Sequence, residues 1–326
     1  HIDRLTPLHS GDFLIIDDAS RRNLELTETL IGGKREGSLL DTLDLSATPM
    51  GARLLRHWLL FPLRNSAAIN ERLAAVEELA RRSRLRAQFR ELLVHITDIE
   101  RLCSRLALNQ GNARDLNSLR LSLERLPDFH ALLSDCTASL LQAMAASFDA
   151  LSDLHTHIFS SIREDAPLGL KDGGLIREGY DPELDRLLVL LRDGKKLILE
   201  LEVKERESSG LAKLKVGFNR VFGYYFELSR AQAEKVPDYF IRKQTLVNAE
   251  RFITPELKEL EESISTAQEK RLELEFELFS RIRDHIAQES KRLLTVSAQL
   301  ASVDVLVALA EAAARYRYCR PEINNE

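Results

Sequence analysis

The stretch KVGFNRVFGYYFELSR, residues 215–230, interrupts a chain that is otherwise rich in Leu, Ala, Glu and Arg at helical spacing. Apolar residues recur here at every second position, namely Leu214, Val216, Phe218, Tyr224, Phe226 and Leu228. A period of two is typical of β-strands with one face buried against a small core. Gly217 and Gly223 allow tight backbone geometry and the close approach of a ligand. The stretch therefore predicts a small β unit.

Two long helical segments flank this β unit. Asp181 and Pro182 form an N-cap and first-turn pair, and the helical pattern then runs for about 40 Å, with Gly194 as a weak point. Thr254 and Pro255 give the same start signal for a second helix, whose apolar residues keep near-heptad spacing. A rising helix, a short insert and a returning helix predict an antiparallel arm with the β unit at its tip.

The rest of the chain predicts a helical core. Residues 66–160 carry apolar stripes at helical spacing, and Thr48 followed by Pro49 is a helix start. The stretch DFLIID, residues 12–17, is short and apolar enough for a brief strand. The predicted fold is mainly α: a helical core domain with a long antiparallel helical arm that carries a small β-rich unit at its tip.

Composition narrows the class of protein. A net charge of −5 over 326 residues argues against a general nucleic-acid coat. Three cysteines without metal-ligand spacing indicate reduced thiols in a cytosolic compartment. The apolar runs are too short for a membrane span and no signal peptide opens the chain, so we expect a soluble, cytoplasmic protein. The starting residue, His1, and the uncapped ending lead us to expect a piece of a longer protein.

Positive charge is concentrated in the β unit. Residues 211–252 contain eight basic and four acidic side chains, a local charge of +4, whereas the remainder carries −9. Phosphates bind cations and neutral donors such as amides, through contacts that carry little sequence information. The candidate phosphate ligands are Lys215, Asn219, Arg220, Arg242, Lys243, Gln244 and Asn248. One interpretation is a nucleic-acid backbone contact; the other is a solvated charged face over an aromatic mini-core.

Three long stretches of the chain are distinctive: they begin LDLSATPMGARLLRHW at residue 43, DGGLIREGYDPELDRLL at residue 172 and LKVGFNRVFGYYFELSR at residue 214. These stretches resemble the MutS family of DNA mismatch repair proteins, and the likeness extends over essentially the whole chain. The resemblance implies the following domains: a core at 1–180, an ascending lever helix at 181–209, a β-rich clamp at 210–253, a descending lever helix at 254–286, and at 287–326 a return to the core that starts the connection to an absent ATPase domain.

The same resemblance implies a function and partners. In the family, the clamps of two subunits cross the DNA and hold its backbone without sequence preference, and the levers connect them to distant ATPase domains. The motif GFN-x-V-x-GYY places Asn219, and QTL-x-NAER places Asn248, at clamp positions that contact DNA; Arg220, Arg242 and Lys243 rest on their charge alone. The implied partners are double-stranded DNA, a second subunit in the intact protein and a MutL-type repair protein, with no membrane.

Two family motifs that would extend this function are missing from the sequence. The phosphate loop G-x-x-x-x-G-K-[ST], whose amides cradle nucleotide phosphates, does not occur. The mismatch-reading Phe-x-Glu motif belongs to an N-terminal domain, and the same letters at Phe89 and Glu91 fall inside a predicted core helix. We therefore expect no enzymatic activity and no cofactor in this chain, with ATP and magnesium belonging to the intact family protein.

Two other classes of function remain open. A coiled-arm protein-interaction module without nucleic-acid binding would use the aromatic side chains as a docking surface, formed by Tyr224, Tyr225, Phe226 and Tyr239. Salt-insensitive binding to duplex DNA beside firm capture of a protein partner would favour it. A hydrolase built on His155 and His157 would need a bound metal, but a spacing of two turns these side chains to different faces of a helix.

Overall fold

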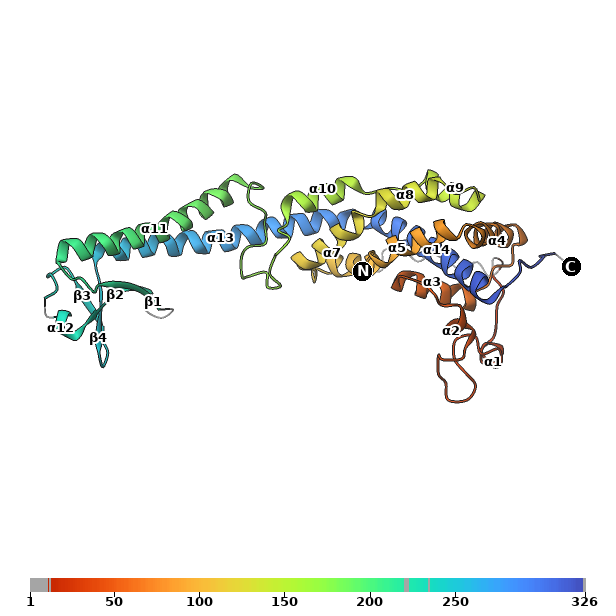
Figure 1. Ribbon diagram of the computed structural model, residues 1–326, viewed down its shortest axis with the longest axis horizontal. Coiled ribbons are helices and arrows are strands. Elements are labelled where there is room, and N and C mark those ends of the chain that lie inside the picture. The colour runs from red at the N-terminus through yellow and green to blue at the C-terminus, as the bar shows by residue number, and fades with distance from the viewer. Residues whose placement is uncertain (1–10, 12, 220–222, 234, 325–326) are drawn as a thin grey trace. The chain divides into compact units, whose positions relative to one another are not determined.

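The computed structural model describes residues 11, 13–219, 223–233 and 235–324 (Figure 1). The chain forms two compact units, residues 1–160 with 282–326, and residues 161–281. The described residues are mainly helical and contain one four-stranded antiparallel sheet. The predicted fold class, mainly α with a small β unit, is therefore confirmed.

The first unit is helical. Its helices are α1 (Asp18–Asn23), α2 (Leu39–Leu43), α3 (Pro49–Leu60), α4 (Ser66–Arg81), α5 (Ser83–Val94), α6 (Ile99–Ala107), α7 (Ala113–Leu123), α8 (Leu126–Ser134), α9 (Ser139–Ala146), α10 (Ser152–Ser161) and α14 (Ser290–Tyr316). The strand expected at residues 12–17 does not form: Asp12 lies outside the described residues, and Phe13 makes only an isolated bridge to Leu63. The N–H of Leu14 donates to the carbonyl oxygen of Pro62 at 2.8 Å, but residues 14–17 are not in a strand.

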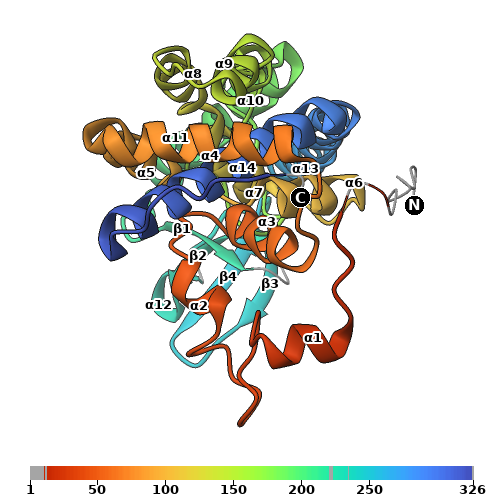
Figure 2. The same ribbon diagram turned by 90° about the vertical axis from the view of Figure 1, so that its right-hand side faces the viewer.

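Helix α14 is the central helix of this unit and contacts α3, α4, α5 and α6 (Figure 2). A window of this helix has mean hydropathy 1.9, long and apolar enough by composition to cross a membrane. The expectation that the apolar runs are too short for a membrane span is therefore wrong for α14. Because 67% of the window is buried inside the protein, the apolar composition is that of a core helix covered on several sides.

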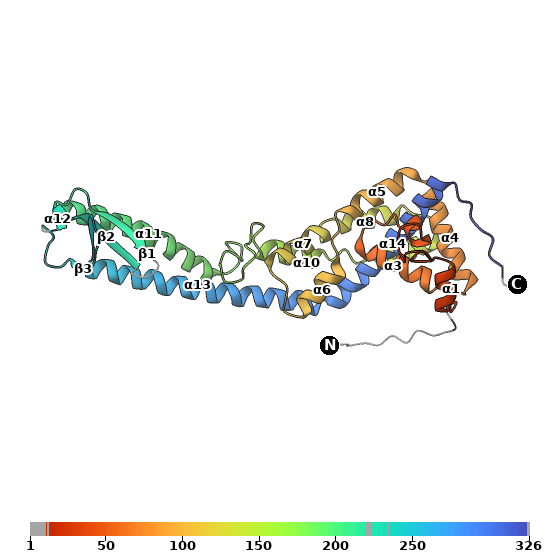
Figure 3. The same cartoon turned by 90° about the horizontal axis from the view of Figure 1, so that it is seen from below.

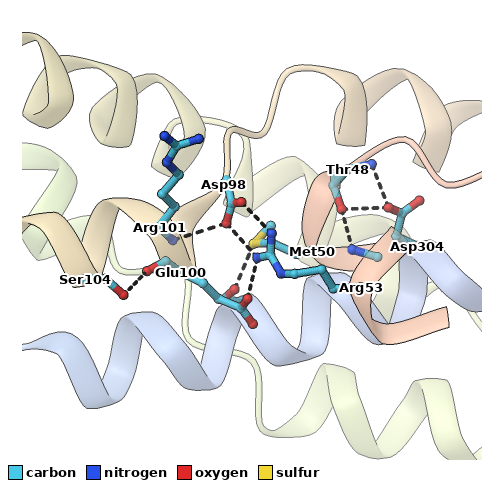
Figure 4. A network of polar contacts seen from close by, with 10 residues as sticks. Thr48, Met50, Arg53, Asp98, Glu100, Arg101, Ser104 and Asp304 are labelled. Carbon is cyan, nitrogen blue, oxygen red and sulfur yellow. Dashed lines mark hydrogen bonds and ion pairs between the residues drawn. The ribbon is translucent and has the colours of Figure 1, made fainter. Parts of the chain in front are cut away.

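One acidic side chain lies within this apolar helix. Asp304 is fully buried and accepts hydrogen bonds from the backbone N–H groups of Ala47 (2.9 Å) and Thr48 (2.8 Å) and from the Thr48 hydroxyl (2.7 Å) (Figure 4). The Thr48 hydroxyl in turn accepts the N–H of Gly51 at 3.0 Å, so Thr48 is the N-cap of α3 as predicted. A Cβ on Gly51 would overlap the Asp304 carboxylate. Asp304 thereby holds the start of α3 against α14.

A second contact ties α3 to α6. Arg53 donates to both carboxylate oxygens of Asp98, at 2.7 and 2.9 Å, and also to Glu100 (Figure 4). Asp98 is itself the N-cap of α6, since it accepts the N–H of Arg101 at 3.2 Å. The acceptors that cap α3 and α6 therefore also join these helices to their neighbours.

The second unit contains two long helices and the sheet. Its elements are α11 (Pro182–Ser209), β1 (Lys215–Asn219), β2 (Gly223–Ser229), α12 (Arg230–Ala233), β3 (Ile241–Thr245), β4 (Ala249–Ile253) and α13 (Pro255–Gln288), whose last residues belong to the first unit. Helices α11 and α13 lie side by side and antiparallel (Figure 3): Lys204 pairs with Glu256 at 2.9 Å, and a Cβ on Gly194 would lie 2.7 Å from the side chain of Ile264. Gly194 is thus a close crossing point and not a weakness.

The sheet has strand order β1-β2-β4-β3. Phe226, Leu228 and Phe252 point from one face into a core shared with α11 and α13, which includes Ile198 and Leu257. This burial explains why the alternating stretch forms strands. The alternating pattern predicted that Phe218 is buried, and this prediction is wrong. Phe218 is 60% exposed and lies beside Tyr224 in an open groove of about 1110 Å³.

Candidate nucleic-acid interface

Three carboxylates of the helices hold the sheet. Glu202 of α11 accepts the N–H of Val216 in β1 at 2.7 Å, and Glu261 of α13 accepts the N–H of Tyr224 in β2 at 3.1 Å. The buried Glu205 accepts the hydroxyl of Tyr239 at 2.7 Å. Because the two strands of the first hairpin bind different helices, the orientation of the sheet depends on both.

The two glycines of the 215–230 stretch have specific neighbours. A Cβ on Gly217 would lie 2.7 Å from the ring of Tyr225, which lies across the glycine from the paired strand. Gly223 has φ +75°, and a Cβ there would overlap the Glu261 carboxylate. The close approach that these glycines allow is made by side chains of the same chain.

The predicted phosphate ligands of the first hairpin lie at one edge of the sheet. Lys215 is exposed at the start of β1, and Asn219 is half-buried at its end. Arg220 lies outside the described residues. In the register of β1 and β2, Lys215 is opposite Glu227 and Asn219 is opposite Gly223, so the two predicted ligands are at opposite ends of the strand.

Arg242 and Lys243 lie on β3, at the other edge. The Arg242 side chain is 57% exposed, with Nε 2.9 Å from a carboxylate oxygen of Glu250 and the guanidinium 5.8 Å from the ring centroid of Phe252. Its charge is therefore already compensated by Glu250. Lys243 is exposed at a break in the register, where Arg242 is opposite Phe252 but Gln244 is opposite Arg251.

Gln244 and Asn248 complete the predicted set. Gln244 is half-buried, and its side-chain oxygen accepts a hydrogen bond from Arg251 at 3.0 Å. Asn248 is exposed in the turn between β3 and β4. Since Ser229 is opposite Ala249 in the sheet, this turn lies at the end where β1 begins, away from Asn219. The predicted ligands thus line two edges and both ends of the sheet and do not form one compact patch.

Five cations of this region are exposed, and none of them has an ion pair within the part of the chain that the structure describes; they are Lys213, Lys215, Arg230, Lys235 and Lys243. Three of these, Lys213, Arg230 and Lys235, were counted in the local charge but were not selected as ligands. The signal that could have selected them is their position outside the alternating apolar face. Exposed cations without an ion pair remain available to neutralise phosphate charge.

The aromatic residues do not form a shared exposed surface. Phe226 is fully buried, Tyr225 is 9% exposed and Tyr224 is half-buried. Tyr239 is 43% exposed, and its hydroxyl is bound by Glu205. These side chains pack the unit rather than offering a docking surface for a protein.

The other candidate residues lie in the helical core. Phe89 is fully buried and packs edge-on against Phe129, with ring centroids 5.2 Å apart. His157 lies 4.9 Å from the ring of His285, and burial lowers its pKa. His155 stacks on Phe159 instead. Among the described residues, no group of three or more His, Cys, Asp or Glu side chains is arranged to hold a metal.

Comparison with known proteins gives one consistent family. The MutS domain III family profile matches residues 19–310. The DNA mismatch repair protein MutS of Myxococcus xanthus is 44% identical over 324 residues, and that of Acetivibrio thermocellus is 45% identical over 326 residues. These alignments cover 99% and 100% of this chain but only 36% and 38% of the relatives, so the chain spans little more than a third of their length.

Proposed function

Because the chain belongs to the MutS family of DNA mismatch repair proteins, we propose that residues 210–253 form a clamp that binds the backbone of double-stranded DNA without sequence preference. Residues 1–180 and 287–326 are the core in this proposal, and α11 and α13 are the levers. The observation that carries the proposal is that the described residues of 210–253 present exposed cations without ion pairs, on and beside a sheet that is fastened to the helix pair.

Electrostatics favours a polyanionic partner for this region alone. The whole chain carries −5, whereas the clamp carries +4, so attraction to DNA is local. Lysine ammonium groups are point charges on flexible stems and suit phosphates whose positions vary from site to site. This chemistry supports contact with the backbone and offers no selection among bases.

In the proposed function, the lever helices α11 and α13 couple the clamp mechanically to the rest of the longer protein. Helix α11 has 28 residues and is therefore about 42 Å long at about 1.5 Å per residue. Glu202 and Glu261 fasten β1 and β2 to α11 and α13, and Glu205 holds the turn before β3, so we infer that a displacement of either helix moves the strand bound to it. We propose that this linkage transmits the position of the clamp to the ATPase domains of the longer protein.

The partners follow from the family. In the intact protein we propose a homodimer whose two clamps enclose the duplex, ATP and magnesium bound outside residues 1–326, and a MutL-type repair protein as a further partner in the cytoplasm. For the present chain we propose DNA binding without ATP hydrolysis.

Titration with duplex DNA at two salt concentrations tests the proposed function. If one clamp neutralises about three phosphates, the logarithm of the binding constant falls with a slope of about −2.7, and raising salt from about 50 mM to about 200 mM weakens binding about 40-fold. A fully paired duplex and a duplex with one mismatch bind equally. Binding that ignores salt, or that requires the mismatch, contradicts backbone clamping.

A further inference from the structure

One polar row crosses the outer face of the sheet, the face turned away from the buried aromatic core. The register places Lys215 of β1 opposite Glu227 of β2, Glu227 opposite Arg251 of β4, and Arg251 opposite Gln244 of β3. The two ends of this row, Lys215 and Gln244, are both predicted phosphate ligands. The two central residues were not predicted to take part.

Arg251 is held by two side chains of the neighbouring strand β2. Its Nε lies 3.0 Å from a carboxylate oxygen of Glu227, and its guanidinium lies 4.2 Å from the ring centroid of Tyr225. The side chain is only 19% exposed. Since its charge is compensated and one face is covered by the ring, Arg251 is badly placed to bind a phosphate itself.

A β-bulge places Gln244 in this row. Lys243 is the extra residue between the pairs Arg242 with Phe252 and Gln244 with Arg251. Without the bulge, the period of two would put Gln244 on the same face as Arg242, which pairs with Glu250. The bulge therefore turns the amide of Gln244 to the outer face and leaves Lys243 exposed beside it.

The hydrogen bond between Arg251 and Gln244 fixes the direction in which the amide of Gln244 points. An arginine has only donors, so the group of Gln244 that lies 3.0 Å from Nη1 of Arg251 is the carbonyl oxygen. The two N–H donors of the amide are left for another acceptor. We propose that Arg251 is a positioning residue for DNA binding, which holds Gln244 with its amide nitrogen toward a phosphate oxygen; this rests on the clamp function proposed above.

Substitutions separate positioning from direct phosphate contact. Gln244→Ala weakens duplex binding about fivefold and leaves the salt slope unchanged, because a neutral donor releases no counterion. Arg251→Lys and Arg251→Met each cause the same loss, since neither can hold Glu227 and Gln244 together. Adding Gln244→Ala to either Arg251 variant causes no further loss. Binding is measured on the 326-residue chain by titration at two salt concentrations, and circular dichroism verifies that each variant is folded.

Three results would overturn the proposal. If Arg251→Lys binds like the parent chain while Arg251→Met loses affinity and flattens the salt slope by about 0.9, Arg251 contacts phosphate by its charge. If Gln244→Ala binds normally while Lys243→Gln weakens binding, the clamp function stands and the role of this row is wrong. If none of these variants, including Lys243→Gln, binds DNA more weakly than the parent chain, both the clamp function and the role of this row are wrong.

Discussion

Asp304 shows how one buried carboxylate can hold two helices. Its two oxygens accept three hydrogen bonds from Ala47 and Thr48, at the N-terminus of α3, where the helix dipole also favours negative charge. Burial nevertheless raises its pKa above the ordinary value. Both oxygens accept hydrogen bonds, so a substitution that removes one oxygen leaves a buried N–H or hydroxyl without a partner.

Asp304→Asn is therefore expected to lower the free energy of unfolding of the first unit by about 2 kcal/mol, because an amide NH2 group would face the donors of Thr48. The single tryptophan, Trp58, lies in α3 and reports the loss by fluorescence during urea unfolding. Asp128→Asn on the exposed face of α8 is the matched control and leaves the midpoint unchanged. An equal response of both variants would show that Asp304 does not hold α3.

At this scale the sequence predicts local contacts and misses distant ones. Thr48 and Pro49 predict the start of α3 because a cap and a first-turn proline act on the next few residues. The partner of Thr48 lies 256 residues away, in a helix whose composition gives no sign of a buried acid. The roles of Gly194 and Gly223 were not predicted for the same reason. The side chains that approach them, Ile264 and Glu261, come from the distant helix α13.

Between elements, Arg292 of α14 joins the start of α10 to the central helix. It lies 2.8 Å from carboxylate oxygens of both Asp149 and Asp153. The hydrogen bonds from Arg292 hold the pKa of each of these carboxyls below the ordinary value of 3.8. A carboxyl group whose pKa is lowered by folding stabilises the fold at pH values above its ordinary pKa. This stabilisation is lost as the pH falls through the lowered pKa.

Arg292→Gln is expected to cost about 1 kcal/mol of stability near neutral pH, a modest figure because the side chains are partly exposed to solvent. The difference between the parent chain and the variant stays constant down to about pH 4 and then shrinks as both aspartates become protonated. Urea unfolding at a series of pH values measures it. Arg186→Gln, which removes an exposed pair within α11, is the control. A difference that grows in acid would mean that another group is responsible.

The elements were predictable where a pattern repeats within them. The period of two predicts the strand β2 because Phe226 and Leu228 are buried on one face, and the apolar spacing predicts the long helices. The bulge at Lys243 was not predictable, because IRKQT alone contains nothing that fixes its register against β4. The exposure of Phe218 depends on how far the helices cover the sheet, which the strand itself does not encode.

For the molecule as a whole, charge segregation was the most useful signal in the sequence. The positive charge is concentrated in residues 211–252, and the lysines of this segment are exposed in the structure. The choice among individual cations could not take account of ion pairs that form between strands. Arg242 was ranked with Lys243, yet only Arg242 lies beside a carboxylate.

This difference gives a final prediction for DNA binding by the whole chain. Lys243→Gln removes an exposed cation and reduces the magnitude of the salt slope by about 0.9, whereas the double substitution Arg242→Gln with Glu250→Gln removes a neutral pair and leaves the slope unchanged. Both are measured by duplex titration at two salt concentrations, with helix content as the test of folding. If the double variant flattens the slope as much as Lys243→Gln does, Arg242 leaves Glu250 to bind a phosphate, and the pairing in the unbound sheet does not persist on DNA.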